Sequence, residues 1–269
     1  MITAVDIGAT KTLVAQFNTS LQPINEVRFE TAKDQVDFFH DLMEQLNRLD
    51  NISTLAVGVP GILDSKGIIL RCANLPWQNF DLKRVLFQHF RCPVLIDNDA
   101  RLAGLAEINA VKPLPALGLY LTVSTGIGGG VVVNGRIVDE LKSEPGHMLF
   151  EFQDVWQEWE DFASGSAIRE HFGMYAKELT TTDQWQEVAK RLTIGLAALI
   201  PALQPTVIVF GGGVGQYSNK FAPFVVEQLK QQLPSYIKIP AIINAQHPQE
   251  AVLYGCYHYA KHRQDSFVS

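Results

Sequence analysis

The chain has 269 residues, a formal net charge of −6 and a hydrophobic content of 47%. This length accommodates two domains of ordinary size, and the composition is typical of a compact α/β enzyme rather than a disordered or fibrous protein. The acidic balance argues against a nucleic-acid partner, because proteins that bind nucleic acid present basic surfaces.

The three cysteines are widely spaced and form no C-x-x-C pair; they are Cys72, Cys92 and Cys256. An odd number without such a motif indicates core thiols in a reducing compartment. The chain enters a strand at its N-terminus, so we expect no signal peptide, and no apolar run approaches the roughly 20 residues of a membrane helix. The sequence therefore predicts a soluble cytoplasmic protein that does not contact a membrane.

The first half of the chain alternates between strand and helix patterns. Residues 2–6 and 13–17 are predicted strands joined by a tight polar turn at 8–12. Residues 32–49 are a predicted helix, whose apolar positions at helical spacing are Val36, Phe39, Leu42, Met43 and Leu46. Further strands are predicted at 54–59, 68–70 and 94–96, with a loop at 74–77 and a helix that Asp81 caps.

The second half continues this alternation. A helix is predicted from Ala100, and the proline-marked segment 111–115 is the candidate boundary between two lobes. Residues 139–146 form a predicted polar loop. Later elements are helices at 183–201, 218–233 and 249–263 and strands at 206–210 and 241–243. Alternating strands and helices favour a mixed α/β sheet in each lobe.

A glycine-rich hairpin at 121–135 dominates the middle of the chain. Four of the five residues 126–130 are glycine, and the second apolar run ends at Asn134-Gly135, a strong hairpin-turn signal. Bare backbone N–H groups in such a turn can approach an anion, although a glycine-rich turn without a ligand explains the pattern equally well. The turn at 8–12 repeats this strand–turn–strand design, which suggests two related lobes that face each other across a cleft. Neither turn matches the common nucleotide motifs, since the chain has no G-x-x-x-x-G-K-[ST] and no G-x-G-x-x-G after a strand.

Asn98 and Asp99 lie where a predicted strand ends and a helix begins. Asn98 can cap this helix, and Asp99 then occupies the first turn, where the helix dipole favours a carboxylate. Strand ends are also where α/β proteins place ligand-binding groups. Capping alone and a functional role both remain open for this pair.

Two further groups have the chemistry of a binding site. The loop after the glycine hairpin carries Glu144 and His147, and Glu160 follows; carboxylates, an imidazole and an amide suit a polyhydroxylated ligand such as a sugar. Taken alone, His147 fits a surface or hydrogen-bonded core histidine better than a ligand group. The glycine run 211–215 lies between a strand and a helix, so it could meet a nucleotide or merely form a tight turn.

The order of these motifs resembles the ROK family of bacterial sugar kinases, over nearly the whole length. Residues 6–11 resemble the first phosphate motif, with Ala9 where the second glycine is usual, and 124–130 resemble the second. Residues 210–215 resemble the adenosine motif, 98–100 the catalytic N-D-A, and 144–147 the sugar-binding E-x-G-H. The segment 161–165 aligns with the one after the family's G-C-x-E motif, which puts Glu160 on the sugar-contacting glutamate.

The resemblance implies the two-lobed actin-like ATPase fold (ribonuclease H-like), with mixed sheets flanked by helices and a central cleft. It implies a small lobe of residues 1–112 plus 250–269 and a large lobe of 113–249. The implied reaction is ATP-dependent phosphorylation of a hexose, first of all glucose at its 6-hydroxyl, with Asp99 as the catalytic base. Implied sugar-binding residues are Asn74, Asn98, Asp99, Glu144, His147 and Glu160. Implied ATP-binding residues are Asp6, Gly8, Thr10, Lys11, Thr125, Gly126, Gly128, Gly212 and Gly213, with Asp6 holding Mg²⁺ through water.

The chain departs from the family at its structural zinc site. Most members have a C-x-C-G-x-x-G-C segment that binds zinc together with the equivalent of His147. The interval 148–159 has no cysteine here, and structural zinc requires four ligands, so we expect no zinc. We expect packing of the interval's apolar side chains to replace the ion; these are Phe150, Phe152, Val155 and Trp156.

Several alternatives remain open. The sugar can be N-acetylmannosamine, N-acetylglucosamine or fructose instead of glucose. The family also includes transcriptional repressors with a helix-turn-helix domain before the first phosphate motif, for which a motif starting at Asp6 leaves no room. A catalytically weak sugar-binding regulatory protein is the third possibility. The resemblance further implies a homodimer, to which the apolar interval 150–162 could contribute.

Overall fold

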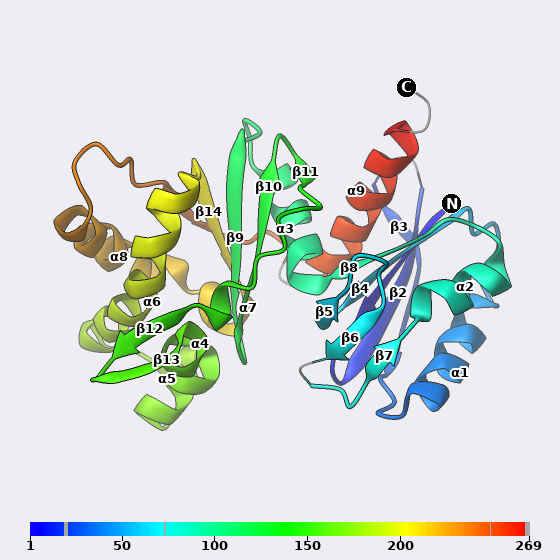
Figure 1. Ribbon diagram of the computed structural model, residues 1–269, viewed down its shortest axis with the longest axis horizontal. Helices are drawn as coiled ribbons and strands as arrows, with labels where there is room; N and C mark the ends of the chain where they lie inside the picture. Colours follow the sequence, from blue (N-terminus) through cyan, green and yellow to red (C-terminus); the bar gives the residue numbers. More distant parts are fainter. Residues whose placement is uncertain (19–20, 73, 248, 267–269) are drawn as a thin grey trace. The chain divides into compact units, whose positions relative to one another are not determined.

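The computed structural model describes residues 1–18, 21–72, 74–247 and 249–266. The chain forms two compact units (Figure 1): unit 1 comprises Met1–Ala106 and Gln249–Ser269, and unit 2 comprises Glu107–Pro248. The first crossing between the units falls within helix α3 (Asp99–Ala110). No helix in the described part of the chain combines the length and apolar character of a membrane span.

The main sheet of unit 1 has the strand order β3-β2-β1-β4-β8. These strands are β1 (Ile2–Ile7), β2 (Lys11–Phe17), β3 (Pro23–Glu30), β4 (Thr54–Val59) and β8 (Val94–Asn98). Strands β1, β2 and β3 pair antiparallel, whereas β4 and β8 follow β1 in parallel. A small antiparallel sheet adds β5 (Gly61–Leu63), β6 (Ile69–Cys72) and β7 (Gln78–Phe80). Strand β3 was not predicted, because its mostly exposed side chains lack an apolar pattern.

Helices cover both faces of the unit 1 sheet (Figure 1). Helices α1 (Gln35–Leu46) and α2 (Leu82–Phe90) share a core cluster with the sheet, and α9 (Ala251–Ser266) packs against β1 and β4. Helix α1 is shorter than predicted, since the Asp34 side chain accepts hydrogen bonds from the N–H groups of Val36 and Asp37 and so starts the helix at residue 35. Val36 is 62% exposed, and Phe38 occupies the core in its place.

Unit 2 has a five-stranded sheet in the order β11-β10-β9-β14-β15. The strands are β9 (Leu117–Val123), β10 (Ile127–Val133), β11 (Arg136–Ile137), β14 (Val207–Gly211) and β15 (Ala241–Asn244). The first three pair antiparallel, and β14 and β15 follow β9 in parallel. The two main sheets therefore share one order of strand directions, as expected for related lobes. The Asn134-Gly135 turn forms as predicted, with positive φ at both residues.

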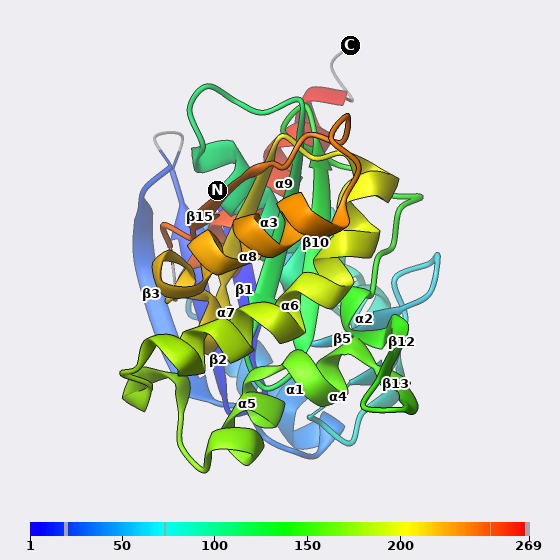
Figure 2. The ribbon, with the colours of Figure 1, turned by 90° about the vertical axis from the view of Figure 1, so that its left-hand side faces the viewer.

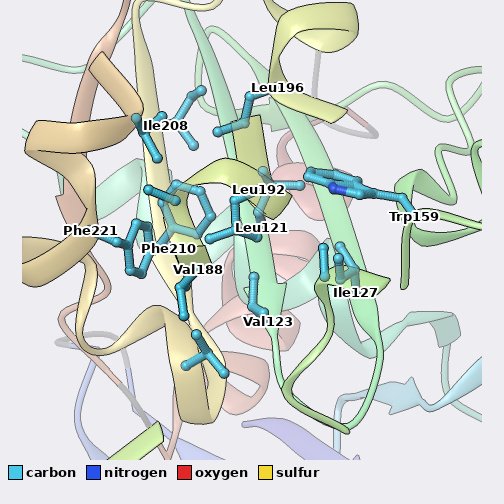
Figure 3. Close-up of a cluster of buried hydrophobic side chains, with 14 of the residues drawn as sticks. Leu121, Val123, Ile127, Trp159, Val188, Leu192, Leu196, Ile208, Phe210 and Phe221 are labelled. Atoms are coloured by element: carbon cyan, nitrogen blue, oxygen red, sulfur yellow. The ribbon is translucent and has the colours of Figure 1, made fainter. Parts of the chain in front are cut away.

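The core of unit 2 lies between its sheet and helices α6 (Thr182–Leu203) and α8 (Ser218–Gln232), which run across one face of the sheet (Figure 2). Figure 3 shows this cluster, in which Leu121, Val123 and Phe210 of the strands meet Val188 and Leu192 of α6. Burying large side chains of this kind contributes about 1.5–3 kcal/mol each. The glycine-rich hairpin is thus anchored by apolar residues in the strand before its turn.

A hairpin and two short helices follow the glycine-rich sheet and were not predicted. The hairpin consists of β12 (Leu149–Phe152) and β13 (Val155–Glu158), and the helices are α4 (Trp159–Ala163) and α5 (Gly165–Phe172). A 3₁₀ turn, η1 (Pro145–His147), precedes the hairpin, and η2 (Ala176–Glu178) precedes α6. The expected apolar packing is only partly correct. Phe150 and Phe152 pack against the core and Phe152 stacks on Phe162, but Val155 is 58% and Trp156 is 70% exposed.

The exposure of these two side chains follows from the pairing of the hairpin. Trp156 lies opposite Glu151, on the face away from Phe152, because side chains alternate along a strand. Val155 lies next to the turn at Gln153 and Asp154, which have positive φ, so it has few neighbours there. The prediction that Val155 and Trp156 replace a metal clip by packing was wrong.

Candidate functional site

Two carboxylates lie at the carboxyl ends of parallel strands in unit 1. Asp6 is near the end of β1, and Asp99 follows the end of β8 as the first residue of α3. Burial, and secondarily the negative charge of Asp99, raises the pKa of Asp6 to about 7. The carboxyl edge of parallel strands is the ligand-binding edge of open α/β sheets. This pair is therefore the strongest candidate for catalytic chemistry in the unit.

Asn98 caps α3, as its position predicted. Its Oδ1 accepts a hydrogen bond of 3.2 Å from the N–H of Arg101, and its Nδ2 donates one of 3.2 Å to the carbonyl of Gly61. Asp99 accepts a hydrogen bond of 2.8 Å at Oδ1 from the N–H of Ala100. Both side chains are thus oriented by the backbone of the strand-to-helix junction.

An ion pair that the sequence reading missed supports this junction. The Arg101 guanidinium lies 3.4 Å from Oδ1 of Asp97, and both residues are buried. The same Asp97 oxygen accepts a hydrogen bond of 2.7 Å from the N–H of Asn98. The spacing of four residues was a usable signal, but a buried pair across a strand end cannot be told from an exposed helical pair by spacing alone.

The first predicted phosphate turn closes tightly. The N–H of Gly8 donates to the carbonyl of Lys11 at 3.0 Å, and a Cβ on Gly8 would lie 2.8 Å from that oxygen, which explains the glycine. Ala9 is not among the described residues with positive φ, so alanine fits where the family usually has glycine. The side chains of Thr10 and Lys11 are exposed. Lys33, an additional basic residue, donates from Nζ to the carbonyl of Ala9 at 2.8 Å.

Asn74 is exposed in the loop between β6 and β7. It lines a pocket together with Arg71, Cys72, Leu75, Pro76, Trp77 and Gln78. Its backbone carbonyl accepts a hydrogen bond of 3.5 Å from Lys33, which also contacts Ala9. Lys33 therefore links the pocket to the first glycine turn.

In unit 2, two separate motifs converge on the carboxylate of Glu160. Its Oε2 accepts a hydrogen bond of 3.0 Å from the N–H of Ile127, in the glycine hairpin. A Cβ on Gly126 would lie 2.5 Å from this oxygen, and one on Gly146 would lie 2.7 Å from it. These two glycines therefore leave room for the carboxylate. Thr125 at the tip of the turn is exposed, and Gly128 is half-buried.

Glu160 is held in place by its neighbour in the chain. Trp159 is fully buried, and its Nε1 donates a hydrogen bond of 3.2 Å to the carbonyl of Arg191 in α6. Gly195 of α6 leaves the space for the indole, since a Cβ there would lie 2.2 Å from it. The first turn of α4 is thereby fixed to α6, which positions the Glu160 carboxylate at the hairpin.

His147 and Glu158 form an ion pair. Nδ1 of His147 lies 2.7 Å from Oε2 of Glu158, and the side chains are 49% and 41% exposed. The hydrogen bond that His147 donates to Glu158 raises the pKa of His147, and the charges of Glu158, Glu160 and Glu144 add to the effect. Glu144 is exposed at the start of η1. Glu158 was not among the predicted site residues.

The side chains around His147 can be compared with the structural zinc site that most family members have. Among the described residues, His147, Glu158 and Glu160 each offer one potential ligand atom, all within 4.8 Å of one another. A structural zinc requires four ligands in a closed tetrahedron. One oxygen of Glu158 is already bonded to His147 and one of Glu160 to the N–H of Ile127. This donor set does not fit a structural zinc.

The glycine run 211–215 ends β14 and forms the short helix α7 (Gly212–Gly215). Gly212 has φ of +80°, and a Cβ there would lie 2.6 Å from the carbonyl oxygen of Val123. Packing therefore explains this glycine without a ligand. Gly213 is exposed, and nothing lies within 4 Å of a Cβ built on it. Gly213, unlike Gly212, therefore has open space beside its backbone.

The predicted site residues fall into two sets. Unit 1 contains Asp6, Gly8, Thr10, Lys11, Asn74, Asn98 and Asp99, and unit 2 contains Thr125, Gly126, Gly128, Glu144, His147, Glu160, Gly212 and Gly213. Within unit 1, Asp6 and Asp99 are close enough to interact, and within unit 2, Glu160 joins the hairpin to the Glu144–His147 loop.

Comparisons with known proteins identify relatives of this chain. A crystal structure of a ROK hexokinase from Thermus thermophilus has a TM-score of 0.81 and 27% identity, over 98% of this chain and 99% of that one. The N-acetyl-D-glucosamine kinase of Escherichia coli O6:H1 is 26% identical over 90% of this chain and 93% of its own. The xylose repressor of Bacillus subtilis is 26% identical over 80% of this chain, which covers 58% of the repressor. The profile of the ROK family matches residues 2–263, so the chain belongs to this family of sugar kinases and regulators and has its two-domain actin-like ATPase fold.

Proposed function

We propose that this protein transfers the γ-phosphoryl group of ATP to a hydroxyl of a hexose, with the 6-hydroxyl of glucose as the first acceptor to test. The observation that carries the proposal is the interacting carboxylate pair of Asp6 and Asp99 at the carboxyl edge of parallel strands. One carboxylate can accept the proton of the sugar hydroxyl, and the other can hold the metal ion of a metal–nucleotide complex. A purely sugar-binding protein needs no second carboxylate at this edge.

Asp99 is the proposed catalytic base. The N–H of Ala100 donates a hydrogen bond of 2.8 Å to its Oδ1, so the backbone fixes the orientation of the carboxylate. Phosphoryl transfer passes through a loose transition state, in which positioning and charge stabilisation matter more than a strong base. An aspartate that accepts the proton as the new bond to phosphorus forms is adequate for this chemistry.

Asp6 is the proposed residue for Mg²⁺, acting through water. A carboxylate oxygen is the ligand type that Mg²⁺ prefers. When bound, Mg²⁺ neutralises charge on the phosphate oxygens during transfer. The proposed phosphate contacts come from the backbone and side chains of the two turns, namely Gly8, Thr10, Lys11, Thr125, Gly126 and Gly128, with Gly212 and Gly213 at the adenosine.

The proposed sugar contacts combine amide, carboxylate and imidazole groups. They are Asn74, Asn98, Asp99, Glu144, His147 and Glu160. Such groups match sugar hydroxyls, each of which both donates and accepts hydrogen bonds. N-acetylmannosamine, N-acetylglucosamine and fructose are the alternative acceptors. Exclusion of water around the bound sugar is required, because water would otherwise accept the phosphoryl group.

The experiment is an ADP-release assay with Mg-ATP over a panel of hexoses and N-acetylhexosamines. Asp99→Asn is expected to lower kcat about 10²- to 10⁴-fold, the usual contribution of a positioned general base, and to leave sugar binding largely intact. Asp37→Asn is the matched control, because Asp37 is also an acidic residue in the first turn of a unit 1 helix but is exposed on α1.

The same assay separates the kinase from a sugar-responsive regulator, the second role that occurs among its relatives. If wild-type protein binds a sugar by calorimetry but turns over none of the panel, the kinase proposal fails and the regulatory role replaces it. If Asp99→Asn and Asp37→Asn have equal activity, Asp99 is not the base.

The remaining parts of the proposal concern organisation. We infer lobes of residues 1–112 with 250–269 and of 113–249, a homodimer to which the exposed face of the β12–β13 hairpin contributes, and a cytoplasmic location. The three buried, unpaired thiols support a reducing compartment. Trp156 and Leu149 are exposed on the same face of the hairpin and support a contact there, because large exposed apolar side chains mark interaction sites when they cluster.

A further inference from the structure

The ion pair of His147 and Glu158 is tied to the backbone on both sides. The N–H of Trp159, next to Glu158, donates to the carbonyl of Met148, next to His147, at 2.8 Å. Glu158 also starts α4, where its own N–H donates to Oδ2 of Asp161 at 3.0 Å. The two side chains therefore meet because the strand register and the helix start bring their backbones together, rather than by flexible reach.

The pair determines which nitrogen of His147 is available. With Nδ1 bonded to a carboxylate, the proton of the neutral ring resides on Nδ1, which leaves Nε2 as the nitrogen available to a ligand. The acidic groups that face the ring come from three elements: Glu144 before η1, Glu158 at the end of β13 and Glu160 in α4. All three favour the imidazolium, in which Nε2 becomes a hydrogen-bond donor.

We propose that Glu158 is a positioning residue, which orients His147 so that its Nε2 meets a hydroxyl of the bound sugar. Glu158 also fixes the loop that carries His147, at a place where the donor set does not fit a zinc ion. The inference rests on the proposed function for the sugar contact of His147. The carboxylate itself does not touch the sugar in this proposal, so its loss weakens sugar binding and leaves the phosphoryl-transfer step unchanged.

The test compares Glu158→Gln with Glu151→Gln. Glu151 is an exposed glutamate of the same hairpin, on β12, and the substitution removes the same charge. The first readout is the pKa of His147, measured by NMR titration. The imidazole resonance of His147 is assigned as the one that is absent in His147→Asn. We expect this pKa to fall in Glu158→Gln and to stay at the wild-type value in Glu151→Gln.

The second readout is the KM for the sugar against kcat. Exposed ion pairs contribute modestly, so we expect KM to rise roughly two- to fivefold in Glu158→Gln with kcat unchanged. The pH at which KM inflects is expected to move down together with the pKa of His147. The control variant is expected to match wild type in all three quantities.

Each result bears on the proposal. An unchanged His147 pKa in Glu158→Gln, or a lowered pKa with KM equal to that of the control, overturns it. Stoichiometric zinc in the purified protein, removed by EDTA with a loss of sugar affinity, overturns it as well. If wild-type protein turns over no sugar, the proposed function fails, and the dissociation constant of a bound sugar then replaces KM in the same comparison.

Discussion

Replacing Asp6 by asparagine is expected to stabilise the protein at alkaline pH while removing its activity. The pKa of Asp6 rises from the ordinary 3.8 to about 7 in the folded chain, through burial first and the charge of Asp99 second. Between these values the folded state holds a proton that the unfolded state has lost. The contribution of Asp6 to the free energy of unfolding therefore falls as the pH rises from about 4 to about 7 and is lowest above that range.

The magnitude follows from the size of the shift. A difference of roughly 3 pH units, at about 1.36 kcal/mol for each, corresponds to at most about 4 kcal/mol above pH 7. Asp6→Asn cannot ionise, so it removes this penalty. We expect its advantage over wild type to be near zero at pH 4 and to grow to a few kcal/mol at pH 8.

The assay is urea unfolding at a series of pH values, without Mg²⁺ or nucleotide. Asp99→Asn is an informative second variant, because it removes only the smaller cause of the shift and should give a smaller gain than Asp6→Asn. Asp37→Asn controls for the loss of an exposed charge. A stability difference between Asp6→Asn and wild type that does not change with pH would refute the reasoning.

Three further predictions concern packing and assembly. Gly213→Ala should keep wild-type stability, since a Cβ there meets open space, and should raise the KM for ATP. Gly212→Ala should lower the midpoint of thermal unfolding, because Gly212 has positive φ and its Cβ would lie against nearby backbone. Arg101→Met should lower the urea-derived stability by about 3–5 kcal/mol by leaving Asp97 buried without its partner, and adding Asp97→Asn should restore part of the loss. Trp156→Glu should convert the proposed dimer to monomer by light scattering with sugar turnover per chain retained, and a monomeric wild type would contradict the interface.

The sequence was sufficient for the elements whose signals are local. The Asn134-Gly135 turn and the Asn98 cap formed as predicted, because each depends on the conformation or hydrogen bonding of a few adjacent residues. The first glycine turn lies between its predicted strands. The second turn spans only residues 124–126, because Gly128, Gly129 and Gly130 pair with β9 as part of strand β10.

Contacts between distant segments could not be predicted in the same way. The pairing of His147 with Glu158 depends on the register of a hairpin with a mixed polar and apolar pattern, which the sequence did not reveal. The sequence did not reveal that the carboxylate of Glu160 lies where a side chain on Gly126 would be, or that the carbonyl oxygen of Ile127 and this carboxylate occupy the same space at Gly146. Only the folded structure separates glycines that packing requires from one such as Gly213, whose Cα faces open space.

All the cysteines lie in one of the two units, so their chemical modification reports on that unit alone. Cys72, Cys92 and Cys256 are buried, and all three belong to unit 1, so unit 2 has no thiol at all. Burial raises the pKa of each, to about 11 for Cys72, and the reactive thiolate is scarce until the surrounding structure opens. The rate of cysteine alkylation in native buffer therefore reports how often unit 1 opens and does not depend on the opening of unit 2. It measures the stability of unit 1 separately, whereas a denaturant curve reports on both units together.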